Sequence, residues 1–293
     1  MNREKNIRFV FFGTPKFSVD VLHALEAHGL LPALVVTAPD KPRGRGLELS
    51  PSLVAQWAHE REIEVVKPEK LTDEHFLAEL HNTDWDVFVI AAYNKLLRKE
   101  VLDMPRRRCL NVHPSLLPKF RGPSPALSTI LADEKITGVS IMQMSEGMDE
   151  GPVVAQAKIE FADDTCPPRG SELEELLATE GGNLLAETLP EWIAGNIEAV
   201  PQDSALATFS HKFSDEDARI DLERAKTDAP YAREAFLKIR AFDKGPRAYA
   251  MIGGKRIILT EAQWKDGQLE ILRVIPEGKK EMNWEEFLRM SAK

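Results

Sequence analysis

The chain has few cysteines, and its apolar segments are all short. Cys109 and Cys166 are the two cysteines among 293 residues, and neither belongs to a CxxC pair, which argues against a disulfide scaffold and against a thiolate metal site. No apolar run approaches the roughly 20 residues that a membrane-spanning helix needs. The polar residues before position 7 do not have the pattern of a signal or transit peptide. We therefore expect a cytoplasmic protein with no membrane partner and no bound metal.

Sequence motifs of several common enzyme classes are also absent. Gly13-Thr14-Pro15 follows an apolar segment but lacks the GxGxxG spacing of dinucleotide-binding proteins. The chain contains no GxxxxGKS or GxxxxGKT loop, no HExxH pair and no GxSxG turn. These absences argue against P-loop chemistry, the commonest zinc hydrolases and nucleophilic serine hydrolases. A set of polar residues without such a nucleophile would favour direct transfer between two bound substrates.

The balance of charge differs along the chain. The formal net charge is −9, which argues against a general nucleic-acid-binding protein. Residues 211–293, however, hold 17 Lys and Arg against 15 Asp and Glu, a net charge of +2, so the remainder carries −11. Basic residues of the remainder are concentrated in the segments 41–45 and 106–121. An acidic body with local basic segments suits a partner that is contacted through a few phosphates.

Short apolar segments alternate with helical periodicity over the first 190 residues. We expect strands at residues 7–12, 31–37, 63–66, 86–92, 108–112, 138–144 and 153–161. Helices are predicted after Pro15, at 54–60, at 72–80 with Thr72 as N-cap, and at 170–189, whereas the glycine-rich segment 40–50 is predicted to be a loop. This order predicts an α/β fold with a mainly parallel, Rossmann-like sheet. In such a sheet the ligand lies at the carboxyl ends of the strands, here after Phe12, Ala92, Val112 and Met144.

The pattern changes from about residue 190. Helical periodicity is found at 215–221 and 230–242, and short strands are predicted at 248–252, 256–260 and 269–274, with Gly253-Gly254 as a hairpin turn. We therefore expect a catalytic domain over residues 1–192, a linker over 193–210, and a smaller C-terminal domain over 211–293 that forms a partial β-barrel.

The most informative polar residues lie between Leu110 and Pro118. Asn111 and His113 are two positions apart on a predicted strand, so their side chains leave from the same face. Pro114 should end that strand at the ligand-binding edge of the sheet. An amide can donate to an oxyanion, and an imidazole can stabilise a tetrahedral intermediate or move protons, so the pair suits acyl transfer. The alternative is a structural histidine beside an asparagine that caps the strand end.

A carboxylate follows a later predicted strand, in a loop flanked by Gly147 and Gly151. We expect Asp149 at the same carboxyl edge, where it can fix the imidazole tautomer and accept a proton from an attacking amine. An ordinary turn aspartate is the alternative. Because three such groups at one edge rarely coincide by chance, we predict Asn111, His113 and Asp149 as the catalytic residues.

This set resembles the motif of the formyltetrahydrofolate-dependent formyltransferases. The similarity rests on Asn111, His113, residues 115–118, Arg121-Gly122 and the Asp149 loop. Within that family the chain is most similar to the branch that formylates methionyl-tRNA, through residues 12–17, 39–46, 138–144, 218–221 and 276–282. The match extends over nearly the whole chain.

The resemblance implies an activity and its substrates. A member of this branch transfers the formyl group of 10-formyltetrahydrofolate to the amino group of initiator methionyl-tRNA for translation initiation. The resemblance gives oxyanion and proton-transfer roles to Asn111, His113 and Asp149. It places the reduced folate against Ser115, Leu116, Leu117 and Pro118 and against the turn of Asn94, Lys95, Leu96 and Leu97.

The resemblance also implies where the tRNA binds. Contacts are expected at Lys41, Arg43, Arg45 and Lys212, although the first three residues would fit a solvated loop as well. The C-terminal barrel is expected to be shortened between Thr260 and Asp266. We expect the protein to be a monomer.

Other functions remain open at this point. A related formyltransferase that acts on glycinamide ribonucleotide or an amino sugar would not need the basic 41–45 segment or a second domain. A non-catalytic tRNA-binding protein would not need all three catalytic residues. A hydrolase that releases formate from the formyl-folate would use water in place of the amine.

Overall fold

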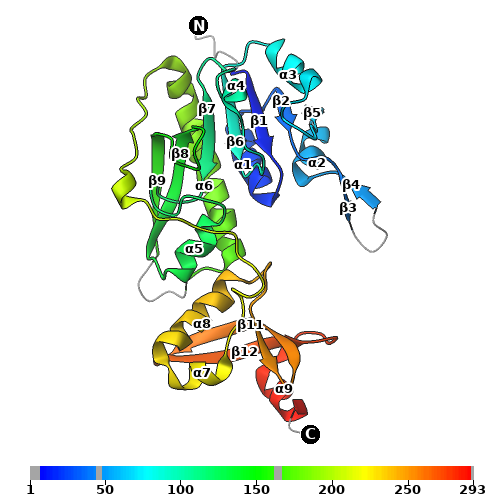
Figure 1. Cartoon of the computed structure of the whole chain (residues 1–293), viewed down its shortest axis with the longest axis vertical. Coiled ribbons are helices and arrows are strands. Elements are labelled where there is room, and N and C mark those ends of the chain that lie inside the picture. Colours follow the sequence, from blue (N-terminus) through cyan, green and yellow to red (C-terminus); the bar gives the residue numbers. More distant parts are fainter. Residues whose placement is uncertain (1–6, 44–47, 162–166, 292–293) are drawn as a thin grey trace. The chain divides into compact units, whose positions relative to one another are not determined.

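The structure, a computed structural model, describes residues 7–43, 48–161 and 167–291 and consists of two compact units (Figure 1). The first unit comprises Met1–Arg121, Gly138–Lys158 and Glu175–Thr208. The second comprises Gly122–Thr137, Ile159–Glu174 and Phe209–Lys293. Each unit gathers segments that are not consecutive in the chain. The linear division into 1–192, 193–210 and 211–293 remains a prediction.

A seven-stranded sheet forms the centre of the first unit, in the order β5-β2-β1-β6-β7-β8-β9 (Figure 1). Its strands are β1 (Phe9–Gly13), β2 (Leu34–Val36), β5 (Glu64–Val66), β6 (Val87–Ala91), β7 (Cys109–His113), β8 (Ile136–Gln143) and β9 (Val153–Glu160). The pairs from β5 to β7 are all parallel, and β8 runs antiparallel to β7. The prediction of a mainly parallel α/β sheet is therefore confirmed.

Helices cover both faces of this sheet because its central strands are apolar on both sides. In β1, Phe9 and Phe11 belong to one buried cluster, and Val10 and Phe12 belong to another. The first cluster includes side chains of α1 (Lys16–Ala27), α2 (Leu53–His59) and α6 (Gly170–Ala194). The second includes side chains of α3 (Glu74–His81) and α4 (Lys99–Leu102). The result is a three-layer arrangement.

Two helix ends differ from the sequence-based expectation. The N-cap of α3 is Asp73, whose carboxylate accepts hydrogen bonds from two backbone N–H groups, so the prediction of Thr72 as N-cap was wrong. A carboxylate at this position also interacts favourably with the helix dipole. Helix α6 continues through Pro190 to Ala194, although a proline inside a helix removes one hydrogen bond. Burial of Leu189 and Trp192 in the first cluster offsets this loss.

The segment 40–50 is not simply a loop. It contains the short antiparallel strands β3 (Lys41–Arg43) and β4 (Glu48–Ser50), and residues 44–47 between them lie outside the described residues.

The second unit contains a four-stranded antiparallel sheet in the order β10-β11-β12-β13. Its elements are α5 (Pro125–Leu131), α7 (Leu222–Thr227), α8 (Ala229–Ala241), β10 (Tyr249–Ile252), β11 (Lys255–Lys265), β12 (Gln268–Pro276), β13 (Met282–Asn283) and α9 (Trp284–Ser291). The predicted turn at Gly253-Gly254 is confirmed, with both residues at positive φ. A second two-residue turn, Asp266-Gly267, also has both φ angles positive, as a tight hairpin requires. Strand β11 therefore runs past Thr260, its predicted end, directly into β12.

One predicted helix of the second unit is wrong. Residues 215–218 form a turn, and the helix begins instead at Leu222, behind Asp221, whose carboxylate caps two N–H groups. None of the helices in the described part of the chain has the length and apolarity that a bilayer crossing requires.

Candidate active site

Strand β7 holds the predicted amide and imidazole. Leu110 and Val112 lie in the first buried cluster, whereas Cys109 lies in the second, on the opposite face of the sheet. By alternation, Asn111 and His113 share the face of Cys109. His113 is the last residue of the strand and is 3% exposed, and Asn111 is partly exposed. Pro114 follows directly, so the predicted end of the strand is confirmed.

The contacts of His113 determine which ring nitrogen carries hydrogen. Its Nε2 lies 3.1 Å from the Phe120 carbonyl oxygen, which can only accept, so Nε2 is the protonated nitrogen. In a neutral ring the lone pair is then on Nδ1, which lies 3.7 Å from Asp149 Oδ2. Burial lowers the pKa of His113 below its ordinary value of 6.5, against the opposing effects of Asp149 and the Phe120 carbonyl. The ring is therefore neutral at pH 7 and presents an acceptor to Asp149.

Asp149 reaches His113 by a route that differs from the predicted one. Because β8 is antiparallel to β7, its carboxyl end lies beside the start of β7: Gln143 is opposite Leu110, and the Met144 N–H donates to the Cys109 carbonyl. The expectation that the chain after Met144 starts at the carboxyl edge of the parallel strands is wrong. The loop after β8 must instead return toward the other end of β7. The two side chains nevertheless meet, as predicted.

Gly151 allows the two ends of this loop to approach each other closely. A Cβ atom on Gly151 would lie 1.9 Å from the Gln143 carbonyl oxygen, a backbone atom that cannot move aside. The Gln143 N–H also donates to the Pro152 carbonyl at 2.9 Å. Asp149 itself has a φ of 51°, in the left-handed region that is unfavourable for a residue with a side chain. The loop is thus held in an unfavourable conformation by its surroundings.

The predicted folate segment 115–118 presents only part of its side-chain surface. Ser115 is fully buried, and its hydroxyl donates to the Lys119 carbonyl at 2.6 Å. Leu117 is 5% exposed, whereas Leu116 and Pro118 are partly exposed. The structure therefore leaves Leu116 and Pro118 as the side chains of this segment that a ligand can contact.

In the turn after β6, too, some of the predicted folate-binding side chains are buried or hydrogen-bonded and others are accessible. Lys95 Nζ donates to the carbonyls of Pro68 and Glu69 at 2.5 and 2.7 Å, and partial burial lowers its pKa. Leu97 is buried in the second cluster, and Leu96 is 75% exposed. Asn94 is exposed as well. Lys95 and Leu97 thus brace the turn, while Asn94 and Leu96 are accessible to a ligand.

Two residues near these loops were not identified from the sequence. Tyr93 lies two residues after the end of β6, and its ring packs edge-on against Phe12, with ring centroids 5.6 Å apart. Burial raises its pKa to about 12, and its hydroxyl has no hydrogen-bond partner among the described residues.

Gln202 donates to the carbonyl oxygens of Asp149 and Gly151 at 2.9 and 2.6 Å. Only the position of Tyr93 after a strand end gave a sequence signal; Gln202 gave none.

The predicted tRNA-binding residues are only partly described. Lys41 is exposed on β3 in the first unit, and Lys212 is exposed in the second. The Arg43 side chain and the whole of Arg45 lie outside the described residues. Their assignment to tRNA stays a prediction.

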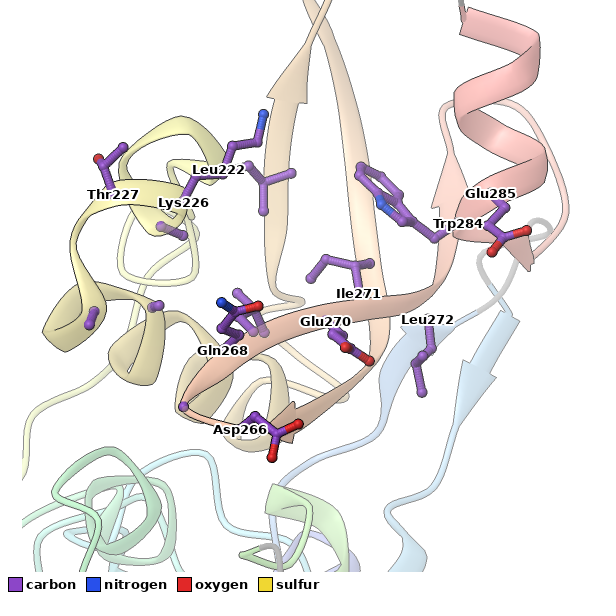
Figure 2. Close-up of a pocket in the computed structure, with 15 residues that line it drawn as sticks. Leu222, Lys226, Thr227, Asp266, Gln268, Glu270, Ile271, Leu272, Trp284 and Glu285 are labelled. Carbon is purple, nitrogen blue, oxygen red and sulfur yellow. The ribbon is translucent and has the colours of Figure 1, made fainter.

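A separate pocket of about 840 Å³ lies within the second unit. Figure 2 shows Leu222, Ile271 and Trp284 around it, from α7, β12 and the start of α9. Its charged lining consists of Lys226, Asp266, Glu270 and Glu285, an excess of carboxylates that does not suit phosphate groups. The pocket contains none of the predicted site residues. In the described ranges, no group of three or more His, Cys, Asp or Glu side chains is arranged to hold a metal ion.

The chain is similar to known proteins over most of its length. Residues 5–189 match a family model described as formyl transferase. A relative from Carboxydothermus hydrogenoformans, named methionyl-tRNA formyltransferase, is 36% identical over 306 residues, which cover 96% of this chain and 96% of that protein. A relative of the same name from Chloroflexus aggregans is 40% identical over 258 residues, which cover 87% of this chain and 80% of that protein.

The fold is also found among solved structures. The structure of HypX from Aquifex aeolicus in complex with tetrahydrofolic acid matches 99% of this chain with a TM-score of 0.64 and 19% identity. This chain spans 48% of the HypX chain. At this level of identity the likeness concerns the fold alone.

Proposed function

The chain belongs to the formyl transferase family, and from that premise we propose that it transfers a formyl group from a reduced folate to the amino group of methionyl-tRNA. The relatives that share a third or more of its residues over most of both chains carry this activity in their names. We propose 10-formyltetrahydrofolate as the donor, with no resident metal, and charged initiator tRNA as the acceptor. We further propose a cytoplasmic monomer that does not associate with membranes.

The facing acceptors of His113 and Asp149 carry the proposed mechanism. Nδ1 and the carboxylate oxygen lie 3.7 Å apart, and neither can donate to the other while the ring is neutral. A bound ammonium group can donate N–H hydrogen bonds to a ring nitrogen and to a carboxylate oxygen at this separation. In the proposal the α-amino group of methionine binds here and loses its proton to this pair, which makes it nucleophilic.

Asn111 acts on the other reactant. Its amide N–H donates to the formyl oxygen as negative charge develops there during attack. The new bond joins the methionine nitrogen to the formyl carbon, and the bond from that carbon to N10 of the folate breaks. His113, once protonated, returns a proton to N10. The products are N-formylmethionyl-tRNA and tetrahydrofolate, with one proton released.

The remaining predicted residues have supporting roles in this proposal. Ser115, Leu116, Leu117 and Pro118, with Asn94, Lys95, Leu96 and Leu97, form the surroundings of the folate, in which the exposed side chains supply contact and the buried ones supply rigidity. Lys41, Arg43, Arg45 and Lys212 contact tRNA phosphates. Because few phosphates are engaged, the affinity should depend only modestly on salt.

One assay tests the proposed function against its rivals. Purified protein is given 10-formyltetrahydrofolate and, in separate reactions, charged initiator tRNA, charged elongator tRNA or glycinamide ribonucleotide. We expect formylmethionine with the initiator tRNA. Preferred formylation of glycinamide ribonucleotide would indicate that the protein has the substrate specificity of another branch of the family. Formate release without any amine would indicate a hydrolase, and no formyl transfer in a single turnover would indicate a non-catalytic binding protein.

A further inference from the structure

A short segment of the first unit connects the loops that carry the candidate active site. Residues 200–208, called the strap below, begin where Val153 exchanges two backbone hydrogen bonds of 2.8 Å with the first strap residue. The strap ends where the Thr208 N–H donates to the Pro118 carbonyl at 3.3 Å and the Thr208 carbonyl accepts from the Arg121 N–H at 2.9 Å. The strap therefore joins the base of the loop after β8 to the loop after β7.

Gln202 is the strap residue whose side chain contacts both loops. Its Nε2 donates to the carbonyl oxygens of Asp149 and Gly151, at 2.9 and 2.6 Å. Its Oε1 accepts from Arg121 Nε at 3.0 Å, and Arg121 is 4% exposed. This pattern fixes the orientation of the amide, because a flipped amide would place oxygen against two carbonyl oxygens and nitrogen against a donor.

The contact with Asp149 has a specific consequence for that residue. Its backbone is held at a φ of 51°, which costs free energy for a residue with a side chain and needs external contacts to persist. Gln202 supplies one such contact to the same residue whose carboxylate lies 3.7 Å from His113 Nδ1. We propose that Gln202 is a positioning residue that holds the Asp149 carboxylate opposite His113. This inference rests on the proposed function for its kinetic consequence only.

Closure of the loop does not by itself require Gln202. The Gln143 N–H already bonds the Pro152 carbonyl, and the Val153 bridge already anchors the strap. The Gln202 side chain adds three hydrogen bonds to these backbone contacts, and one of them is to Asp149 itself. Its particular contribution is to fix the backbone of Asp149, and with it the position of the Asp149 carboxylate relative to His113.

The first experiment compares Gln202→Met with the parent enzyme and with Gln56→Met. Met has nearly the length of Gln but lacks its donors and acceptor. Gln56 serves as the control because its amide also donates to a backbone carbonyl, of Pro51, but at an exposed position on α2. We expect Gln202→Met to lower kcat by about 10- to 100-fold with little change in KM, since a misplaced catalytic group costs rate rather than binding. Gln56→Met should match the parent, and equal kcat in all three proteins would overturn the proposal.

A second variant separates the two halves of the amide. Gln202→Glu keeps an acceptor for Arg121 but replaces the donor with an oxygen that repels the two carbonyls. If positioning of Asp149 is the role, kcat falls in Gln202→Glu as it does in Gln202→Met. Recovery of the parent rate in Gln202→Glu would assign the effect to Arg121 and overturn the proposal.

A third measurement does not depend on activity. The Asp149 charge raises the pKa of His113 against the effect of burial, so displacement of the carboxylate should lower that pKa further. An NMR titration of the His113 ring in the parent and in Gln202→Met should show this decrease, at unchanged folded-state dispersion of the spectrum. An unchanged titration would overturn the positioning role even if activity were lost. If Gln202→Met lowers the pKa of His113 but the parent enzyme transfers no formyl group, only the proposed function is contradicted.

Discussion

The candidate-site loops of the first unit and the sheet of the second unit use their polar side chains in different ways. In the first unit, His113, Ser115 and Arg121 are at least 95% buried, and each makes a hydrogen bond that fixes a loop. In the sheet of the second unit, charged and amide side chains pair at the surface, as Arg256 does with Asp215 and Gln263 with Glu270. Buried polar contacts demand one geometry because an unpaired group is costly, whereas surface pairs tolerate exchange. The difference indicates that the candidate-site loops are held in one geometry, whereas the sheet of the second unit tolerates substitution at these surface positions.

The largest expected effect tests whether the second unit depends on its core rather than on its surface pairs. Phe236 on α8 is fully buried and packs against the Trp264 ring at 6.0 Å. Phe236→Ala should lower the free energy of unfolding by about 3–5 kcal/mol, from lost burial and the remaining cavity. Urea titration followed by tryptophan fluorescence measures the change. A loss below about 1 kcal/mol would mean that surface pairs, not the core, stabilise this unit.

The next effect tests the positioning role of the first unit. Asn111→Ala should lower kcat by about 10²–10³-fold, because a donor to the developing oxyanion is lost, while circular dichroism stays unchanged. Gln263→Ala is the matched control, an amide on the exposed surface of the second unit. Its kcat should equal that of the parent. Parent-like turnover in Asn111→Ala would remove Asn111 from the catalytic set.

Acid should affect the first unit before the second. Because the pKa of His113 is lowered from 6.5, the unfolded chain gains a proton as pH falls through 6.5 while the folded protein does not, so unfolding becomes more favourable below pH 6.5. Activity persists until pH reaches the lower pKa of the folded state, where Nδ1 is protonated. A kcat profile and urea titrations from roughly pH 5 to 8 measure both changes. His81→Gln, at an exposed position on α3, should leave the profile unchanged, whereas a rise of kcat in acid would contradict a neutral His113.

The smallest expected effect is at an ion pair of the second unit. Arg233 donates to Asp133 at 2.8 and 3.0 Å, and this contact lowers the pKa of Asp133 below its ordinary value of 3.8. Its contribution is present above pH 3.8 and is lost as pH falls through the lower pKa of the folded state. Both side chains are 26–36% exposed, so a double-mutant cycle of Asp133→Asn and Arg233→Met should give a coupling of about 0–1 kcal/mol. A larger coupling energy would mean that a partly exposed ion pair of the second unit contributes as much as a buried polar contact of the first unit.

Much of the fold could be predicted because its signals are local. The continuous apolar runs of β1, β6 and β7 predict strands buried on both faces, and Gly253-Gly254 predicts a hairpin. Errors arose where neighbouring residues compete for one role. Thr72 and Asp73 can both cap α3, and only the backbone conformation decides between them.

The sequence predicted which residues form the candidate site better than it predicted how the chain brings them together. Asn111 and His113 follow from alternation on one strand, and Asp149 meets His113 as expected. The buried state of Ser115 and Leu97 gave no signal, because residues in a loop of mixed composition can face either way. These facts depend on neighbours from other parts of the chain.

The sequence by itself determined which strands are apolar on both faces and where β7 ends. It also placed an amide and an imidazole on one face, because each of these features follows from a period of two and a proline within a few residues. Only the tertiary structure decided the direction of β8, the path of Asp149 and the contacts of Gln202. Gln202 lies 53 residues from Asp149 and 81 from Arg121, and no local preference encodes which distant groups complete one another's hydrogen bonds.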